Sequence, residues 1–469
     1  MQITTRDFLK KLGLGGAAVA TGAAFADEWV PTPGQPLPPG SCGDPENAWF
    51  GKNIFPLPHT QADGPSCFMK DGKVYEPAHE LPVFHETDVV VVGGGPAGFA
   101  AAVAAAKTGA KVALVERYGS LGGLFTNGMV LIVLATSRKE SGGSYSLVTR
   151  GVCEEFMLRT ATYGKNFCNP PESSIPARIW HPTIDPECAK FVMDQMIAEN
   201  KVEMFFHSWG VDVIQDGNKV LGVVFESKQG RQAILAKQVV DCTGDADMLF
   251  KAGGDYRQVT TPISTVFRWS GLTSINPPKG EKPAYITRGN EGNPDACWSG
   301  MSHMRGNGVD IRDLSRIEIA QRAENWKLMQ KMRATPGWEN VYTSNSASQL
   351  GVRQSRLVDC ELVLDRKAVK AGPNPADCVC WFGKDGPHEA WPVAYRQIVP
   401  TKVDNLLVAG RCIGTGDTID TCRLIAPCFV TGEAAGTAAA LAAAKGIAPR
   451  ALDVTLLQKT LRAHGAYVG

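Results

Sequence analysis

The strongest pattern in this chain is a set of continuous apolar runs that end directly in glycine or in charged residues. The run ETDVVVVGGG, residues 86–95, is β-branched at its centre, which is typical of a strand covered on both faces in a parallel sheet. We predict a helix from about Pro96 to Lys107 and a second strand in KVALVER, residues 111–117. Strand, helix and strand together make a βαβ unit.

The pattern changes twice further along the chain. Between residues 201 and 241, runs such as KVLGVVFES alternate with Asp-Gly and Gly turns and predict short strands. Residues 256 to about 390 are irregular, and a helix is expected there from Asp313 to Met332. NLLVAG at 405–410 then predicts a buried strand, and FVTGEAAGTAAALAAAKG at 429–446 predicts a small-residue helix packed closely on a flat surface.

Composition narrows the class of protein. A chain of 469 residues is long enough for roughly two or three domains, and 44% hydrophobic with 20% charged residues is ordinary for a globular protein. The formal net charge is +1 and no basic stripe occurs, which argues against nucleic acid as a partner. Residues 27–85 are rich in Pro and Gly and predict an extended leader.

The N-terminus has the layout of an export signal. Basic Arg6, Lys10 and Lys11 precede a Gly/Ala-rich apolar run that ends in Ala24-Phe25-Ala26, an A-x-A cleavage pattern. The apolar run is shorter than the ~20 residues of a membrane span, so no stable span is expected. The start resembles a twin-arginine signal with Thr5 in place of the first arginine. We predict that residues 1–26 are a signal peptide and that the protein is exported to the periplasm; an amphipathic N-terminal helix is the alternative.

The cysteines do not predict a metal site. The chain has 13 of them and no C-x-x-C pair, so the usual zinc, iron–sulfur and haem spacings are absent. Cys42 and Cys67 are candidates for a disulfide in an oxidising compartment. Cys378 and Cys380 form the closest pair, and most others are expected to be buried, inert thiols.

The glycines after the first strand predict a dinucleotide site. Gly93 permits a tight turn, Gly95 allows the backbone to approach a pyrophosphate, and Gly98 allows close packing of helix on strand. The helix N-terminus attracts the phosphates, and Glu116, about twenty residues later, suits ribose hydroxyls. A purely structural glycine turn is the alternative. A second glycine pair in ERYGSLGG favours FAD over NAD, because it lets another loop lie against the pyrophosphate. The predicted cofactor residues in this half are Gly93, Gly95, Pro96, Ala97, Gly98, Glu116, Arg117, Gly122 and Gly123.

With these motifs the chain resembles the FAD-dependent oxidoreductase family whose flavin domain is of the glutathione reductase type. The matching pieces are the 88–117 segment, GSLGGLFTNG, QVVDCTGDADMLFKAG, GVRQSRLVDCELVL and VDNLLVAGRCIGTGDTIDTCRLIAPCFVTGEAAGTAAALA. The resemblance covers roughly residues 86–446 and is looser between 256 and 340.

The resemblance implies roles for the later motifs. DCTGDAD resembles a turn near the pyrophosphate and ribityl chain, lined by Thr243, Gly244 and Asp245; a surface turn after a strand is the alternative. AGR resembles the last strand end beneath the ribityl. APCFVTGEAAG resembles the helix start that faces the flavin N1–C2=O edge, unless its small residues only pack the helix. These two motifs add Gly410, Arg411 and Gly432 to the predicted cofactor residues.

The catalytic candidates are polar residues within apolar motifs. Arg353 and Arg356 in GVRQSR have the spacing of one helix face, where an arginine fork binds a carboxylate. Arg423 lies in the C-terminal flavin motif, and Asp417 takes the place where relatives carry a histidine. Each arginine could instead form a structural ion pair. His181 is an alternative acid/base.

The predicted architecture is α/β, with a discontinuous Rossmann-like FAD-binding domain at 86–255 and 390–450. An α+β substrate domain is inserted at 256–389, and 451–469 is a tail. Flavin N5 would exchange a hydride with a small organic substrate. No second GxGxxG follows a strand, so we expect a dehydrogenase without its own NAD(P)H domain, with a quinone, a redox protein, oxygen or a second organic molecule as the electron partner. The alternatives are an enoate or fumarate-type reductase fed by a separate carrier, a non-catalytic flavin-binding protein, and thiol–disulfide exchange.

Overall fold

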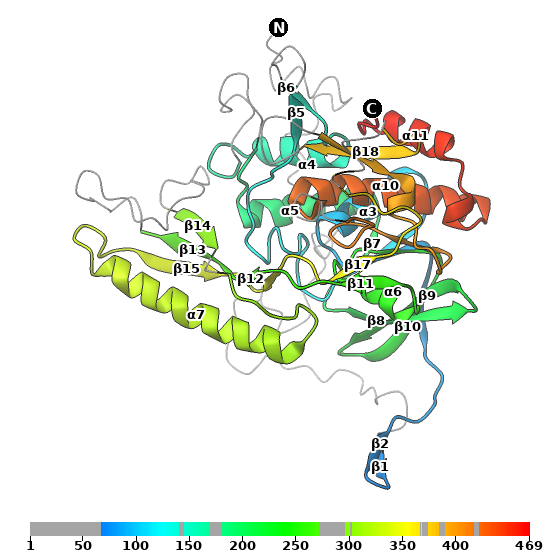
Figure 1. The fold of residues 1–469 in the computed structure, drawn as a ribbon, viewed down its shortest axis with the longest axis horizontal. Helices are drawn as coiled ribbons and strands as arrows, with labels where there is room; N and C mark the ends of the chain where they lie inside the picture. Colours follow the sequence, from blue (N-terminus) through cyan, green and yellow to red (C-terminus); the bar gives the residue numbers. More distant parts are fainter. Residues whose placement is uncertain are drawn as a thin grey trace, which may run out of the picture. The chain divides into compact units, whose positions relative to one another are not determined.

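The computed structural model describes residues 67–139, 145–168, 181–271, 296–300, 303–365, 367, 374–383, 390–416 and 422–469. They fall within one compact unit, Asp63–Gly469 (Figure 1). The predicted signal peptide, the first part of the leader and Asp417 lie outside the described residues.

A seven-stranded sheet forms the centre of this unit (Figure 1). Its strand order is β7-β4-β3-β10-β9-β8, and β20 also pairs with β10. The predicted βαβ unit is confirmed, because β3 and β4 are parallel neighbours joined by α3. The strands are β3 (Val83–Val92), β4 (Val112–Val115), β7 (Glu203–Phe205), β8 (Trp209–Asp216), β9 (Lys219–Ser227), β10 (Gly230–Asp241) and β20 (Leu406–Val408).

Strand β10 joins the early and late parts of the chain. Along one edge of β10, Gly230 to Leu235 pair antiparallel with β9. Further along, Val239 to Asp241 pair in parallel with Leu406 to Val408 of β20. The short strands predicted between residues 201 and 241 are therefore confirmed, and they bring residues 406–408 into the same sheet.

Two helices with small side chains cover this sheet and contact each other closely. They are α3 (Pro96–Lys107) and α10 (Ile425–Lys445). A side chain on Gly432 would overlap the carbonyl oxygen of Ala97, and one on Gly436 would overlap that of Ala101. Gly432, predicted to face the cofactor, therefore lies where α10 packs on α3, and the predicted flat surface is largely a second helix.

A separate small core lies between α7 (Ile311–Arg333) and the sheet β14-β13-β15, two elements that lie next to each other in Figure 1. The strands are β13 (Val266–Ser270), β14 (Ala296–Gly300) and β15 (Tyr342–Ser346). Phe267 and Trp269 pack there with Met329, Met332 and Trp338. The predicted helix from Asp313 to Met332 is confirmed, with two residues more at its start and one at its end.

The remaining elements frame these two cores. β18 and β19 form an antiparallel hairpin whose residues Val379 and Val393 both belong to the main core, so the predicted boundary at 389 falls inside this hairpin. Within the predicted leader, β1 and β2 form another hairpin. The elements are β1 (Phe68–Lys70), β2 (Lys73–Tyr75), β5 (Ser137–Lys139), β6 (Tyr145–Leu147), α4 (Val152–Ala161), α5 (Pro186–Glu199), α6 (Asp247–Lys251), β11 (Tyr256–Gln258), β12 (Ile263–Ser264), β16 (Gly351–Val352), β17 (Arg356–Val358), β18 (Cys378–Gly383), β19 (Ala390–Ala394), η3 (Tyr395–Gln397), η4 (Pro449–Ala451) and α11 (Val454–Ala463).

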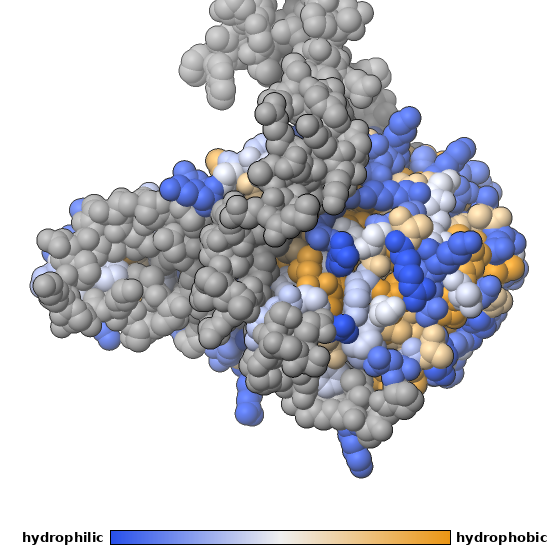
Figure 2. Space-filling view, turned by 90° about the horizontal axis from the view of Figure 1, so that it is seen from above, coloured by the Kyte–Doolittle hydropathy of each residue, from blue (hydrophilic) through white to orange (hydrophobic). Residues whose placement is uncertain are grey.

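Helix α10 is the one described helix whose length and composition would allow it to cross a membrane. However, 94% of its most apolar window is buried inside the protein, which is the pattern of a core helix. Figure 2 shows hydrophilic residues spread among apolar ones over the described part of one face, as on most globular surfaces.

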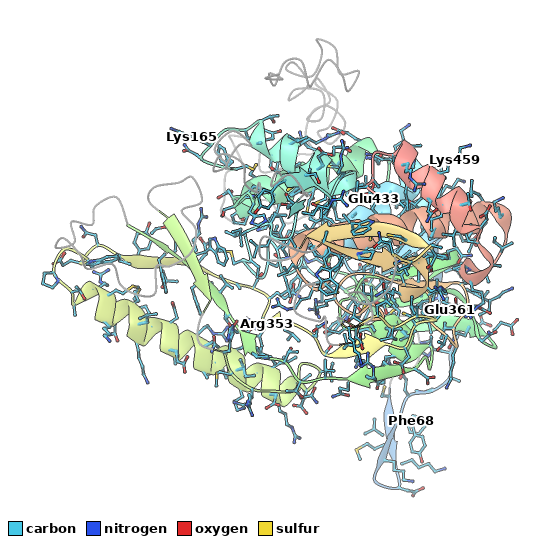
Figure 3. All side chains as sticks on the ribbon, turned by 45° about the horizontal axis from the view of Figure 1, so that its top comes forward. Phe68, Lys165, Arg353, Glu361, Glu433 and Lys459 are labelled. Carbon is cyan, nitrogen blue, oxygen red and sulfur yellow. The ribbon has the colours of Figure 1, made fainter. Side chains whose placement is uncertain are left out.

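One charged residue of α10, Glu433, is fully enclosed (labelled in Figure 3). Its Oε2 accepts a hydrogen bond from the N–H of Val152, 3.1 Å away, at the start of α4. Its Oε1 has no partner among the described atoms, and Gly151 leaves room for the carboxyl group because it has no side chain. Burial raises the pKa of Glu433 to about 8, while the hydrogen bond from Val152 and the nearby Lys107 act to lower it.

We expect a rise in pH to lower the stability of the natural protein but not that of the Glu433→Gln variant. A carboxyl group with a raised pKa in the fold stabilises the folded state below its unfolded pKa, and this contribution is lost as pH rises through the folded value. The free energy of unfolding of the natural protein should therefore fall relative to the variant between pH 5 and pH 8. Urea unfolding of the purified proteins measures it, with Glu80→Gln, an exposed site, as the control. A constant difference across this range would contradict the raised pKa.

Candidate functional site

A pocket opens where the carboxyl ends of β3, β4, β10 and β20 meet at one edge of the sheet. Ligands of open α/β sheets bind at this kind of edge. The described wall contains many of the predicted residues from both halves of the chain: Gly93, Gly95, Pro96, Ala97, Glu116, Arg117, Gly123, Thr243, Gly244, Gly410, Arg411 and Arg423.

The glycine turn shapes the pocket beside α3. The N–H of Gly93 donates to Val115 at 2.8 Å, and its φ of +96° suits glycine. A side chain on Gly98 would overlap the carbonyl oxygen of Gly93, which agrees with the predicted close packing. Gly95 differs, because a Cβ there would meet nothing nearer than Gly123, at 3.9 Å. The space beside Gly95 therefore belongs to the pocket.

Two helix N-termini reach this pocket. Gly95 caps α3 without a side-chain hydrogen bond, and Leu424 does the same for α10. Ile425 and Cys428 from the first turn of α10 line the wall. Both ends therefore offer backbone N–H groups and the positive end of a helix dipole, an arrangement that attracts phosphate and other anionic groups.

Glu116 is held in place at the end of β4. Its Oε2 accepts from the N–H of Gly94 at 2.6 Å, and its Oε1 accepts from the N–H of Tyr118 at 2.8 Å. Burial raises its pKa, and these two backbone hydrogen bonds act in the opposite direction. The carboxyl group is thus oriented before a ligand arrives, and its remaining lone pairs can accept from ribose hydroxyls.

The second glycine pair lies against the first turn. The N–H of Gly122 donates to the carbonyl of Gly94 at 2.8 Å, and a Cβ on Gly123 would stand 2.9 Å from the Cα of Gly95. Gly123 lines the pocket, whereas Gly122 shapes the loop behind it, with a φ of +104°.

Two aromatic residues that the sequence patterns did not indicate, Tyr118 and Trp209, also line the pocket. The guanidinium of Arg117 lies 5.0 Å from the ring centroid of Tyr118 and 5.6 Å from that of Trp209. These are cation–π distances. Trp209 remains 55% exposed at the start of β8, and an exposed tryptophan beside a predicted cofactor residue could have drawn attention to it.

The residues predicted in the turn after β10 have two different positions in the structure. Asp241 accepts from the N–H and the hydroxyl of Thr243, at 3.1 and 2.7 Å, and Thr243 and Gly244 line the pocket. Asp245 does not belong to the described wall. Its carboxylate instead pairs with Arg411 at 2.8 Å and accepts from the Ser355 hydroxyl at 2.5 Å. Asp245, which was predicted to line the pocket, instead holds Arg411 in the wall.

The predicted arginine fork on a helix is also wrong. Arg353 lies between the short strands β16 and β17, and Arg356 begins β17. Arg356 pairs with Asp247 at 2.7 Å, donates to the Asp245 carbonyl and stacks over Phe250 at 4.4 Å. It therefore has the role of the predicted alternative, a structural ion pair.

Arg353 and Arg423 occupy different surroundings from Arg356. Arg423 lines the pocket just before α10. Arg353 lies 2.6 Å from Nε2 of His303, a residue that the sequence patterns did not indicate. His181 is not part of the described wall.

The cysteines do not favour thiol chemistry. Every described cysteine side chain other than Cys67 is buried. Burial raises the pKa of Cys378 to about 12 and that of Cys380 well above its ordinary value, so neither thiol ionises readily.

Comparison with known proteins identifies the kind of cofactor site. A family model described as FAD dependent oxidoreductase matches residues 88–267 and 258–461. Over 47 residues, 10% of each protein, the chain is 56% identical to dihydrolipoyl dehydrogenase of Trypanosoma brucei brucei. It is 28% identical to thiamine thiazole synthase of Pyrococcus abyssi over 176 residues, 36% of this chain and 63% of that protein. The chain thus matches less than two thirds of each of these relatives.

Solved structures give weaker likenesses. A geranylgeranyl bacteriochlorophyll reductase-like protein from Thermoplasma acidophilum is 15% identical with a TM-score of 0.43, covering 81% of this chain and 83% of that one. A flavocytochrome c3 fumarate reductase is 15% identical with a TM-score of 0.37, covering 77% and 79%.

Two neighbouring glycines should respond differently to alanine. Gly95 has a φ of −66° and an open Cβ position, so Gly95→Ala should fold normally and bind FAD at least about tenfold more weakly, because the methyl group occupies ligand space. Gly98→Ala should destabilise the apoprotein by about 1–3 kcal/mol through overlap with Gly93. The FAD-to-protein ratio after gel filtration measures cofactor binding, and the thermal midpoints of the apoproteins measure stability. Full FAD retention by Gly95→Ala would contradict this assignment.

Proposed function

This chain belongs to the FAD dependent oxidoreductase family, its cofactor is FAD, and on that premise we propose that it exchanges a hydride with a small organic substrate. Flavin N5 supplies the hydride chemistry when FAD is bound. We further propose a dehydrogenase without its own NAD(P)H domain, which passes electrons to a quinone or to a separate redox protein, and a flavin domain of the glutathione reductase type.

The pocket itself is the observation that carries this proposal. Its glycine turn leaves space for a pyrophosphate beside Gly95, and Glu116 is oriented to accept from ribose hydroxyls. Arg411, held by its ion pair with Asp245, places guanidinium N–H donors in the wall. Together these residues offer hydrogen-bonding groups that suit the pyrophosphate and the ribose of FAD.

The α10 end of the pocket supports a redox role. Negative charge that develops on a bound flavin is stabilised by the positive end of a helix dipole, and the first turn of α10 lines the pocket there. Arg423 precedes this turn and also lines the pocket. A substrate on this side of the pocket would meet both groups.

Anaerobic absorbance of the purified FAD-loaded protein tests the proposal. Sugars, hydroxy acids, amines and enoates are added separately while the flavin band is followed. Bleaching by one compound is expected, since a dehydrogenase takes hydride from its substrate, and that compound names the substrate class. The Gly95→Ala protein is the matched control, because it should fold but hold little FAD.

If no compound bleaches the flavin, dithionite reduction followed by enoates separates the alternatives. Reoxidation by an enoate would replace the dehydrogenase with a reductase of the fumarate type. A flavin that neither donors nor enoates affect would contradict turnover and leave a flavin-binding protein.

We also propose that the chain is exported to the periplasm after removal of residues 1–26. Basic residues, an apolar run and Ala24-Phe25-Ala26 support this. A full-length chain expressed in a Gram-negative host should appear in the periplasmic fraction, and mass spectrometry should find Asp27 at its N-terminus. Replacing Arg6 with Gln should retain it in the cytoplasm. A cytoplasmic product that still begins at residue 1 or 2 would contradict export.

A further inference from the structure

The region between the FAD pocket and α7 contains a polar group that the glycine and flavin motifs leave unexplained. It begins with Ile263 of β12, which pairs on one side with Met304 and on the other with Val352. Both backbone hydrogen bonds between Ile263 and Met304 are 2.9 Å long. Three separate segments of the chain are thereby fixed side by side.

Alternation along these segments separates two faces. Leu350 and Val352 are buried with Ile263 and Ile317 in a cluster against α7. Side chains of successive residues in extended chain point to opposite faces, so Arg353 faces away from this cluster.

Gln349, on the other side of Leu350, lines the FAD pocket. Arg423, another residue of the pocket wall, lies close enough to His303 for its positive charge to act on that histidine. The Arg353–His303 contact is therefore near the pocket.

His303 precedes Met304 and, by the same alternation, lies on the face of Arg353. The two side chains meet, with 2.6 Å between a terminal nitrogen of Arg353 and Nε2 of His303. Because arginine only donates, Nε2 accepts, and His303 is neutral with its proton on Nδ1. In agreement, burial and the positive charges of Arg353 and Arg423 lower the pKa of His303.

The pair leaves positive charge available. Within the described part of the chain, the only side-chain partner of Arg353 is His303, and no carboxylate neutralises it. A guanidinium has five N–H donors in a planar fork that matches oxyanions, and this contact uses one of them. Arg353 is half-buried and His303 is exposed, so a ligand can reach both (Arg353 is labelled in Figure 3).

We propose that Arg353, His303 and Arg423 form an oxyanion-binding site beside the FAD pocket, and that this site holds a carboxylate or phosphate group of the organic substrate. Arg353 supplies the fork, His303 orients it, and Arg423 lies on the side of the pocket. The assignment of the ligand as substrate rests on the proposed function. The substrate would be an organic acid or a phosphate ester held with its reacting carbon toward the pocket.

Isothermal titration calorimetry on the full-chain protein, with malonate and with inorganic phosphate at constant ionic strength, tests this site directly. The natural protein should bind at least one of the two anions, and stronger binding of malonate or of phosphate identifies which group the site prefers. Arg353→Gln should weaken that binding at least tenfold. Arg353→Lys keeps the charge and loses the fork, so its affinity for the anion should lie between those of the natural protein and of Arg353→Gln. Arg312→Gln, at an exposed arginine on α7, is the matched control and should bind as the natural protein does.

Binding of neither anion, or equal binding by the Arg353→Gln and Arg312→Gln proteins, would overturn the inference. Calorimetry does not depend on flavin reduction, so this result is separate from the absorbance test. A protein that holds and reduces FAD but binds no anion would retain the proposed function and lose only this site. A protein that holds no FAD but binds an anion through Arg353 would retain this site and lose the proposed function.

Discussion

The close contact between α3 and α10 is the constraint on which the pocket depends. Gly432 and Gly436 allow the α10 backbone to lie against Ala97 and Ala101, and Gly98 brings α3 down onto the turn after β3 in the same way. With larger side chains at these positions the helices would stand further apart. Because they are close, both N-termini open into one pocket and combine their dipoles there.

The sequence predicted best what depends on neighbouring residues. The valine run of β3, the glycine turn and Glu116 lie close together in the sequence. The local pattern of residues was therefore enough to predict how they are arranged. By contrast, Arg353 and Arg356 have helical spacing, but Gly351 and the alternating burial of Leu350 and Val352 place them in extended chain. The pairing of β16 with β12 and of β17 with β11 keeps this segment extended. These partner strands are distant in the sequence, so a local pattern does not predict the pairing.

The same limit applies to the partners of charged residues. Arg356 contacts Asp247 and Arg411 contacts Asp245, each pair joining distant parts of the sequence. Burial, followed by the charge of Asp245, raises the pKa of Asp247, which fits a carboxylate that depends on its arginine. A buried pair adds little net stability, but losing one member leaves an unpaired charge. These pairs therefore fix the turn after β10 in position more than they strengthen the fold.

The edge of β10 that is shared by β9 and β20 has a consequence for how the protein is made. The pocket begins with residues that are synthesised early, at Gly93, and is completed by Arg423 and Cys428 near the end. A nascent chain that has reached β10 thus has an unpaired strand edge and only part of the cofactor wall, until residues 406–445 emerge and add β20 and α10. The wall of the cofactor pocket is therefore complete only after Cys428 has been synthesised, and the early residues alone provide only part of the contacts for FAD.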